Sequence, residues 1–216
     1  MIAVAVPLGF YLVTKLYANR NIRFPAYYGA VGVDSVSRGG VMHYDTNYHQ
    51  VGDFHLTNQL GQPCSFDSIG PKVVLVDFFF TSCPSFCPTL SRNLKWVQTS
   101  FAASDTGLRI LSFTVDPKHD SVARLRAYAD HYGADPDVWW LLTGDKKQIY
   151  DMARKQFFVD AEQGDGGPED FVHTDKWVLL DRHRFIRGYY SGVDSADVKR
   201  CMHDIAMLMI EKDLKH

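Results

Sequence analysis

Two cysteines four residues apart, Cys83 and Cys87, are the residues of this sequence whose type and spacing most directly indicate chemistry. Each is followed by a proline, and the pair stands between the apolar run VVLVDFFF (73–80) and a segment of helical periodicity that opens at Pro88. If a helical turn holds both cysteines, their sulfurs lie on one face, and the free N–H groups at a helix start favour thiolate over thiol. Such a pair can close a disulfide or bind a soft metal ion.

The segments around the cysteines alternate between apolar runs and amphipathic stretches. Continuous apolar runs indicate buried strands, and apolar residues at helical spacing indicate helices that cover them. This order predicts an α/β fold with a mixed central sheet flanked by helices. The predicted strands are 73–80, 108–115, 138–142, 176–181 and 185–190, with an early hairpin around Leu56 and Cys64. The predicted helices open at Pro88, near Val122, after Asp145 and near Val198.

The first residues carry an apolar segment that we expect to anchor the chain in a membrane. Residues 1–14 contain no charged side chain, which is short for a full span of ~20 residues. A cleaved signal peptide and a buried helix are the alternatives. The basic residues that follow oppose a domain outside the cytoplasm under the positive-inside rule, unless basic residues precede Met1 in the native protein. We expect an anchor over 1–19, an irregular tether over 20–48, and one domain over 49–216 outside the cytoplasm, in the periplasm or an equivalent compartment.

Composition excludes several classes of protein. The chain of 216 residues is 46% hydrophobic, enough for a core, and its net charge of −2 gives no electrostatic reason to expect nucleic acid as a partner. Four cysteines are too few for a scaffold built on disulfides. Cys64 and Cys201 fall at apolar positions and are predicted to be buried and unpaired.

Three motifs together resemble the SCO/SenC family of membrane-anchored, thioredoxin-like copper proteins. They are FFFTSCPSFCP around the cysteines, the strand end at Asp116-Pro117, and Phe171-Val172-His173-Thr174 before the late hairpin. The resemblance covers residues 50–212 and implies a thioredoxin-like fold. It also implies that Cys83, Cys87 and His173 bind copper and that the protein is a metallochaperone. Its partner would be the copper-receiving subunit of cytochrome c oxidase, where a dinuclear copper site is assembled, or another exported copper protein.

Elementary coordination chemistry agrees with this ligand set. Thiolates select Cu(I), and one imidazole completes a three-coordinate site that can also hold Cu(II). Zinc is the competing metal, but structural zinc sites normally have four protein ligands, and no fourth cysteine or histidine is evident. Asp170 and Asp175 could orient the imidazole, although ordinary loop carboxylates are the simpler interpretation.

Asp77 is the candidate for proton transfer. It lies six residues before Cys83 in an apolar strand, where an ionised carboxylate is costly, and the V-D-F step is similar to one in thioredoxins that places a proton acceptor beside a thiol. A carboxyl group bonded to the backbone at the strand end is the alternative.

Two other functions use the same cysteines. The chain could be a thiol–disulfide oxidoreductase that reduces an exported copper protein, or, less well supported, a peroxide-reducing thiol enzyme. The peroxide-reducing enzyme would need a suitably placed arginine, and Arg92 is expected on a helix surface. His173 distinguishes copper binding from thiol–disulfide exchange, since disulfide exchange needs no distant imidazole. We therefore expect a copper-binding assembly factor rather than an enzyme.

Overall fold

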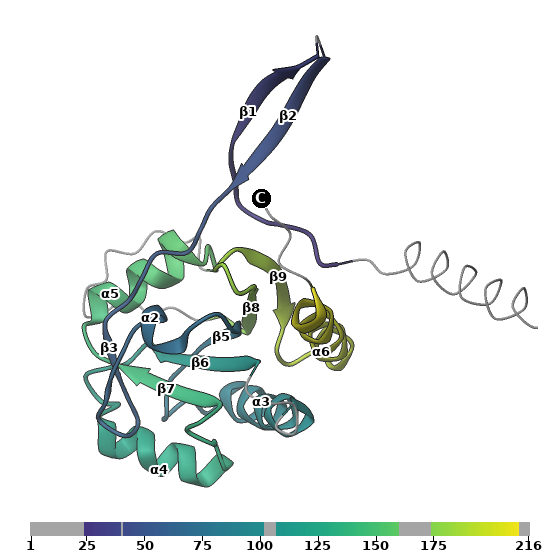
Figure 1. The fold of residues 1–216 in the computed structure, drawn as a ribbon. Helices are drawn as coiled ribbons and strands as arrows, with labels where there is room; N and C mark the ends of the chain where they lie inside the picture. Colours follow the sequence, from purple (N-terminus) through teal and green to yellow (C-terminus); the bar gives the residue numbers. More distant parts are fainter. Residues whose placement is uncertain (1–23, 40, 102–106, 160–173, 212–216) are drawn as a thin grey trace, which may run out of the picture.

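The computed structural model describes residues 24–39, 41–101, 107–159 and 174–211, and its centre is a seven-stranded mixed sheet (Figure 1). β5 (Val73–Phe79) pairs in parallel with β6 (Leu108–Thr114) and antiparallel with β8 (Lys176–Leu180). The strand order is β4-β3-β7-β6-β5-β8-β9. The remaining strands are β3 (Leu56–Asn58), β4 (Pro63–Cys64), β7 (Trp139–Thr143) and β9 (Ile186–Ser191).

Helices cover both faces of this sheet. One face packs against three helices, α3 (Cys87–Phe101), α4 (Val122–Tyr132) and α6 (Ser195–Ile210). The other face packs against α2 (Phe66–Ile69), α5 (Lys146–Asp151) and the π-helical turn η1 (Met152–Gln156). The predicted α/β fold with a mixed sheet flanked by helices is confirmed.

Alternation along β5 decides which side chains reach the cysteine side of the sheet. Every residue of β5 is buried, which explains why its sequence is a nearly continuous apolar run and does not alternate with polar residues. Val74, Val76 and Phe78 join the core under α2 and α5, whereas Val73, Leu75 and Phe79 join the core under α3. Because successive side chains point to opposite faces, Asp77 shares the face of α3.

The predicted secondary structure agrees with the observed elements over most of the domain, with local differences. The early hairpin is β3 and β4, and each predicted strand overlaps an observed one. The helix predicted to start after Asp145 does begin at Lys146, where the Asp145 side chain accepts the Gln148 N–H and caps it. The short helix α2 was not predicted.

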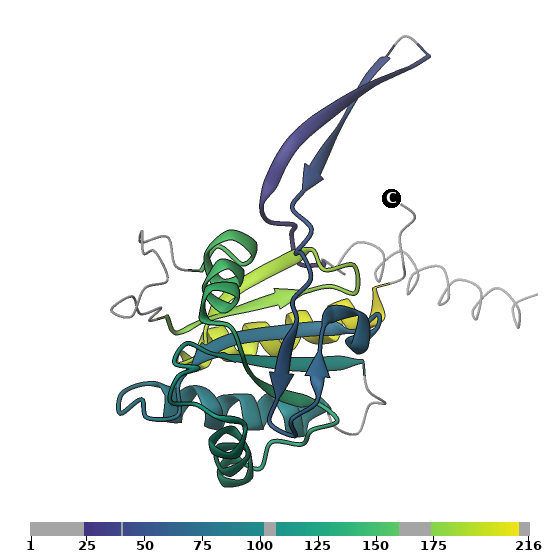
Figure 2. The ribbon, with the colours of Figure 1, turned by 90° about the vertical axis from the view of Figure 1, so that its left-hand side faces the viewer.

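A second difference lies before the domain, where an irregular tether was expected over 20–48. The described part of that segment contains β1 (Ala30–Arg38) and β2 (Val41–Tyr48), which form a separate antiparallel hairpin. Figures 1 and 2 show this hairpin projecting away from the domain. Gly39 adopts a φ of +61°, as a tight hairpin turn requires, and Tyr27 stacks on Tyr48 at its base with ring centroids 5.0 Å apart.

The expected anchor over residues 1–19 lies outside the described residues. In the part of the chain that the structure describes, no helix combines the length and the apolar character needed to cross a membrane.

A buried arginine holds the end of the domain where β8 turns into β9. Arg187 on β9 is 2% exposed, and its guanidinium donates to Asp181 at 3.0 Å and to both carboxylate oxygens of Glu211 at 2.7 and 3.0 Å. It also donates to the Pro25 carbonyl at 2.8 Å and lies over the Tyr27 ring, 4.1 Å from its centroid. One side chain therefore joins the incoming chain, the β8–β9 turn and the end of α6.

We expect Arg187→Ala to lower the free energy of unfolding by about 3–5 kcal/mol, because it leaves two carboxylates without their buried cation. Urea unfolding followed by circular dichroism measures the change. Lys147→Ala is the matched control, since Lys147 bonds Asp151 at 2.7 Å in an exposed pair, and exposed pairs contribute little. Equal effects of the two substitutions would contradict the role of Arg187 described here.

Candidate metal centre

Cys83 and Cys87 lie where the chain leaves β5 and enters α3. Cys87 is the first residue of the helix, and Cys83 lies in the preceding loop. This corrects the prediction that one helical turn holds both cysteines. Pro84 is the reason, because a residue that precedes proline is pushed away from helical backbone angles.

The start of α3 also differs by one residue from the prediction that Pro88 opens the helix. The Phe86 carbonyl accepts the N–H groups of Thr89 and Leu90 at 2.9 and 3.0 Å, so the helix begins at Cys87. Pro88 is then the second helical residue, where its missing N–H has no partner to lose.

The loop brings the two thiols together in an apolar environment. Cys83 is 7% exposed and Cys87 is 1% exposed, and both belong to the hydrophobic cluster between the sheet and α3. The Cys87 thiol hydrogen-bonds to Cys83. The two sulfurs are therefore neighbours even though only one of them is in the helix.

Cys83 is surrounded by groups that stabilise a thiolate. Burial raises the pKa of its thiol, but hydrogen bonds from the Cys87 thiol, the Ser85 hydroxyl, and the backbone N–H groups of Cys87 and Ser85 outweigh burial and lower the pKa below its usual value. The Ser85 oxygen lies 3.4 Å from the sulfur. Cys83 is thus the more acidic thiol of the pair.

Cys87 has the opposite tendency. Burial raises the pKa of its thiol, and so does the neighbouring Cys83, while a backbone hydrogen bond from Phe80 lowers it by less. The negative charge of Asp77 adds to the increase. Cys87 therefore keeps its proton, and Cys83 is the thiol of the pair that ionises first.

Asp77 lies in the same core, inside a polar chain that crosses three strands. Ser112 is its register partner on β6 and donates its hydroxyl to the Asp77 carboxylate. The Trp139 indole N–H on β7 donates to the Ser112 oxygen at 2.7 Å. Burial raises the pKa of Asp77 to about 7, against the opposing effect of Ser112. The carboxyl group can therefore gain or lose a proton near neutral pH.

Sequence analysis did not single out Ser85, Ser112 or Trp139. Ser112 had a signal that could have been used, because it is a polar residue inside the apolar run LRILSFTV (108–115). A buried polar side chain needs a hydrogen-bond partner, and Asp77 is the polar residue of the neighbouring strand.

The third predicted ligand, His173, lies outside the described residues, as does Asp170. Within the described ranges, no group of three or more His, Cys, Asp or Glu side chains is placed to hold a metal ion. The next described residues lie close to α3: the Asp175 carbonyl accepts the Gly192 N–H at 2.8 Å, and Asn93 of α3 donates to the Gly192 carbonyl at 2.8 Å. The Asp175 carboxylate accepts the Ser191 hydroxyl.

The other two cysteines lie on other elements of the fold. Cys64 on β4 and Cys201 on α6 are buried free thiols, which confirms the prediction for both, and burial raises the pKa of each. A high pKa keeps a thiol protonated and unreactive.

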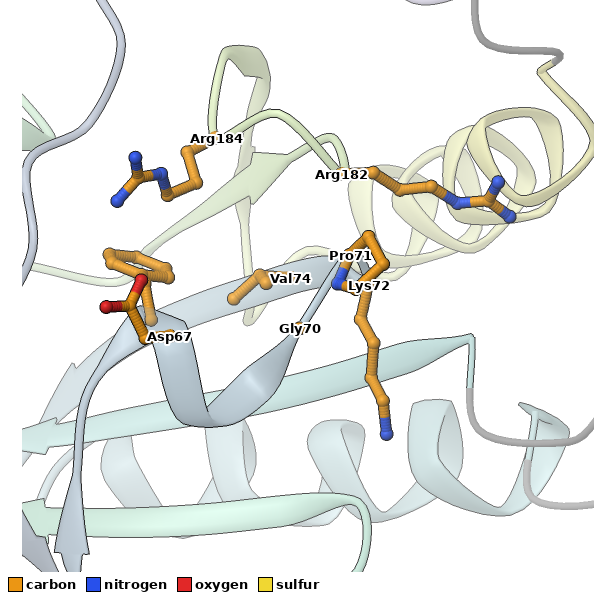
Figure 3. Close-up of a pocket in the computed structure, with 8 residues that line it drawn as sticks. Asp67, Gly70, Pro71, Lys72, Val74, Arg182 and Arg184 are labelled. Atoms are coloured by element: carbon orange, nitrogen blue, oxygen red, sulfur yellow. The ribbon is translucent and has the colours of Figure 1, made fainter.

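A concave region of about 460 Å³ lies at the opposite end of β5, between α2 and the β8–β9 turn (Figure 3). Its basic side chains diverge: Arg182 extends toward α6, where it donates to the Met209 carbonyl at 3.0 Å, while Arg184 extends to the side where Asp67 lies. Lys72 points away from both. Side chains that point in different directions cannot bind one small ligand together.

Comparisons with known proteins agree on one family. The SCO1/SenC family model matches residues 43–209. The SCO1 protein homolog of Bacillus subtilis is 29% identical over 168 residues, which are 77% of this chain and 86% of the relative.

Two solved structures share the fold. A SCO1/SenC family lipoprotein from Bacillus anthracis superposes with a TM-score of 0.65 at 26% identity, over 74% of this chain and 95% of that chain. BsSco, described as a member of the Sco family of cytochrome c oxidase assembly proteins with a disulfide switch, superposes with a TM-score of 0.64 at 28% identity, over 76% and 95% of the two chains.

The raised pKa of Asp77 predicts how stability depends on pH. The folded chain holds this proton up to about pH 7, whereas the ordinary pKa is 3.8. Folding therefore takes up a proton between these values, and the free energy of unfolding falls as pH rises through that window. Asp77→Asn cannot ionise but keeps an oxygen for Ser112. As pH rises through this window, its free energy of unfolding relative to that of the wild type should therefore increase by up to about 1.4 kcal/mol per pH unit.

Urea unfolding of reduced protein at pH 5, 6, 7 and 8 checks this expectation. Asp130→Asn, at an exposed position of α4, is the control and should follow the wild-type pH dependence. A difference between Asp77→Asn and wild type that is the same at every pH would contradict the assignment.

Proposed function

The chain belongs to the SCO1/SenC family, and from this premise we propose that it is a copper metallochaperone that binds copper through Cys83, Cys87 and His173. In this proposal it delivers copper to the subunit of cytochrome c oxidase that carries the dinuclear copper site, or to another exported copper protein. The observation that carries the proposal is the hydrogen-bonded thiol pair at the carboxyl end of β5.

The chemistry of the pair suits a soft metal ion. Thiolates prefer Cu(I), and the pKa of the Cys83 thiol is lowered because Ser85 and the Cys87 N–H donate to its sulfur. Cys87 must lose its proton when the metal binds. We propose Asp77 as the acceptor of this proton, since its charge acts on Cys87 and its pKa of about 7 allows it to gain and release a proton near neutral pH.

His173 completes the proposed ligand set. It is the residue directly before Thr174, where the described chain resumes. The hydrogen bonds from Asp175 through Gly192 to Asn93 join this point to α3, the helix that begins at Cys87. A short path between the chain at Thr174 and the cysteine helix supports an imidazole that reaches the thiols. Two thiolates and one imidazole can hold Cu(I), and also Cu(II).

The proposed location is the membrane, with the domain outside the cytoplasm. Support comes from the uncharged residues 1–14 and from the similar protein of Bacillus anthracis, which is a lipoprotein. In this arrangement residues 1–19 anchor the chain, and the domain works in a compartment where copper proteins are assembled.

Thiol–disulfide exchange is the second candidate function, and the asymmetry of the thiols favours it. A more acidic Cys83 beside a protonated Cys87 is the arrangement of an attacking thiolate and its resolving partner. Copper binding and disulfide formation exclude each other in one molecule, because the oxidised pair offers no thiolate.

We expect the reduced domain to bind one Cu(I) per chain and the oxidised domain to bind none. Anaerobic titration against a chromogenic Cu(I) chelator measures the stoichiometry. Cys83→Ser/Cys87→Ser should abolish binding, whereas Cys64→Ser/Cys201→Ser, which removes the same number of thiols, should retain it. Full stoichiometry in the first double variant would refute the proposal.

His173→Ala separates copper binding from thiol exchange. We expect it to lower the Cu(I) affinity by at least tenfold, because even residues that only orient a ligand cost about 10–100-fold when lost. The equilibrium between the thiol pair and a glutathione buffer should hardly change, since the imidazole takes no part in the disulfide. His203→Ala, at an exposed position of α6, is the control. Unchanged copper affinity with a shifted thiol equilibrium would favour the oxidoreductase.

A further inference from the structure

Asp120 is a fully buried carboxylate beside the cysteine loop, with an exposed fraction of 0%. It accepts two hydrogen bonds from Thr81: the backbone N–H at 3.0 Å and the side-chain hydroxyl at 2.5 Å. A third comes from the hydroxyl of Thr114, the last residue of β6, at 2.5 Å. Thr81 is the second residue after β5 and stands two residues before Cys83.

Hydrogen bonds rather than an ion pair stabilise this carboxylate in the described part of the chain. Among the described residues, it has no lysine or arginine partner, and its hydrogen bonds come from the two threonines alone. A buried carboxylate is costly unless hydrogen bonds satisfy it. Two of its three donors belong to one loop residue, so the interaction that satisfies Asp120 also fixes the position of Thr81.

Asp120 is itself held on a rigid support. Its backbone N–H donates to the Asp116 carbonyl at 2.9 Å, and the Asp116 N–H donates to the Thr114 hydroxyl oxygen at 3.1 Å. The next residue, Ser121, caps α4 by accepting the Arg124 N–H. The turn that carries Asp120 is therefore tied to β6 on one side and to α4 on the other.

We propose that Asp120 is a positioning residue for the thiol pair: by holding Thr81, it keeps the loop in the form in which Cys83 meets Cys87. Where copper is concerned the inference rests on the proposed function. It also concerns a property that needs no metal, because both a disulfide and a bound metal ion require the two sulfurs to be close. A preorganised loop loses less conformational entropy when the disulfide forms or the metal ion binds.

Four variants test the inference. Asp120→Ala removes both acceptor oxygens, and Asp120→Asn keeps one. Thr81→Val removes only the hydroxyl donor of the loop and is the variant most certain to fold. Tyr150→Phe is the matched control, since it removes one hydroxyl that donates to the Val115 carbonyl at 2.9 Å in the core on the opposite face of the sheet.

The first measurement is the equilibrium of each protein with glutathione. Oxidised glutathione takes two electrons from Cys83 and Cys87 and leaves as two reduced glutathione molecules that carry the two thiol protons, while the Cys83–Cys87 bond forms. The second measurement is Cu(I) affinity by chelator competition. We expect Thr81→Val and Asp120→Ala to lower both constants roughly tenfold, the order expected when the backbone of one loop residue becomes free. Both constants of Asp120→Asn should lie between those of wild type and Asp120→Ala, and both constants of Tyr150→Phe should match those of wild type.

The outcomes separate this inference from the proposed function. If wild type binds copper and Thr81→Val and Asp120→Ala equal it in both constants, the inference is overturned and the proposed function stands. If wild type binds no copper but the disulfide constant still falls in these two variants, the proposed function fails and the inference stands. If the two constants fall as far in Tyr150→Phe as in Thr81→Val, the cause is a general loss of stability, and the inference is overturned.

Discussion

β5 is enclosed on every side, bonded to β6 and β8 at its edges and covered by helices on both faces, and this enclosure determines where chemistry can occur. The chain can leave such a strand only at its ends. At the carboxyl end it passes Thr81 and delivers Cys83 and Cys87 to the start of α3. Because β6 runs parallel to β5, its own carboxyl end lies at the same edge, and the turn that carries Asp120 is brought beside the cysteine loop.

Three of the buried charged side chains in the described part of the chain are stabilised in different ways. The pKa of Asp77 is raised to about 7, so that protonation avoids the cost of burying a negative charge. Asp120 is satisfied by hydrogen bonds from threonines. Arg187, near the amino end of β5, is paired with two carboxylates. The two groups at the cysteine end are those that can influence the thiols, one through charge and one through position, whereas the arginine joins the chain ends to the sheet.

The thiol pair combines properties that agree with the proposed role of holding and releasing copper. Cys87 is shielded from water and keeps its proton, while Cys83 carries donors that stabilise negative charge. A soft cation bound by both sulfurs would replace the thiol protons and meet two thiolates in an apolar setting, where electrostatic attraction is stronger than in water. The short loop before α3 leaves Ser82, Pro84 and Ser85 exposed, so a partner protein can approach one side of the pair.

The sequence by itself determined the layered α/β fold, since long apolar runs make buried strands, and the type and spacing of the cysteine pair made it the candidate site. Pro84 was present as a local signal that Cys83 lies outside the helix. Only the tertiary structure decided that Ser112 donates to Asp77, 35 residues away, and that Thr81 donates to Asp120, 39 residues away. The position of the hairpin before the domain was decided at the same level. Such contacts depend on strand register and on the order of strands in the sheet, and neither leaves a periodic trace in the local sequence.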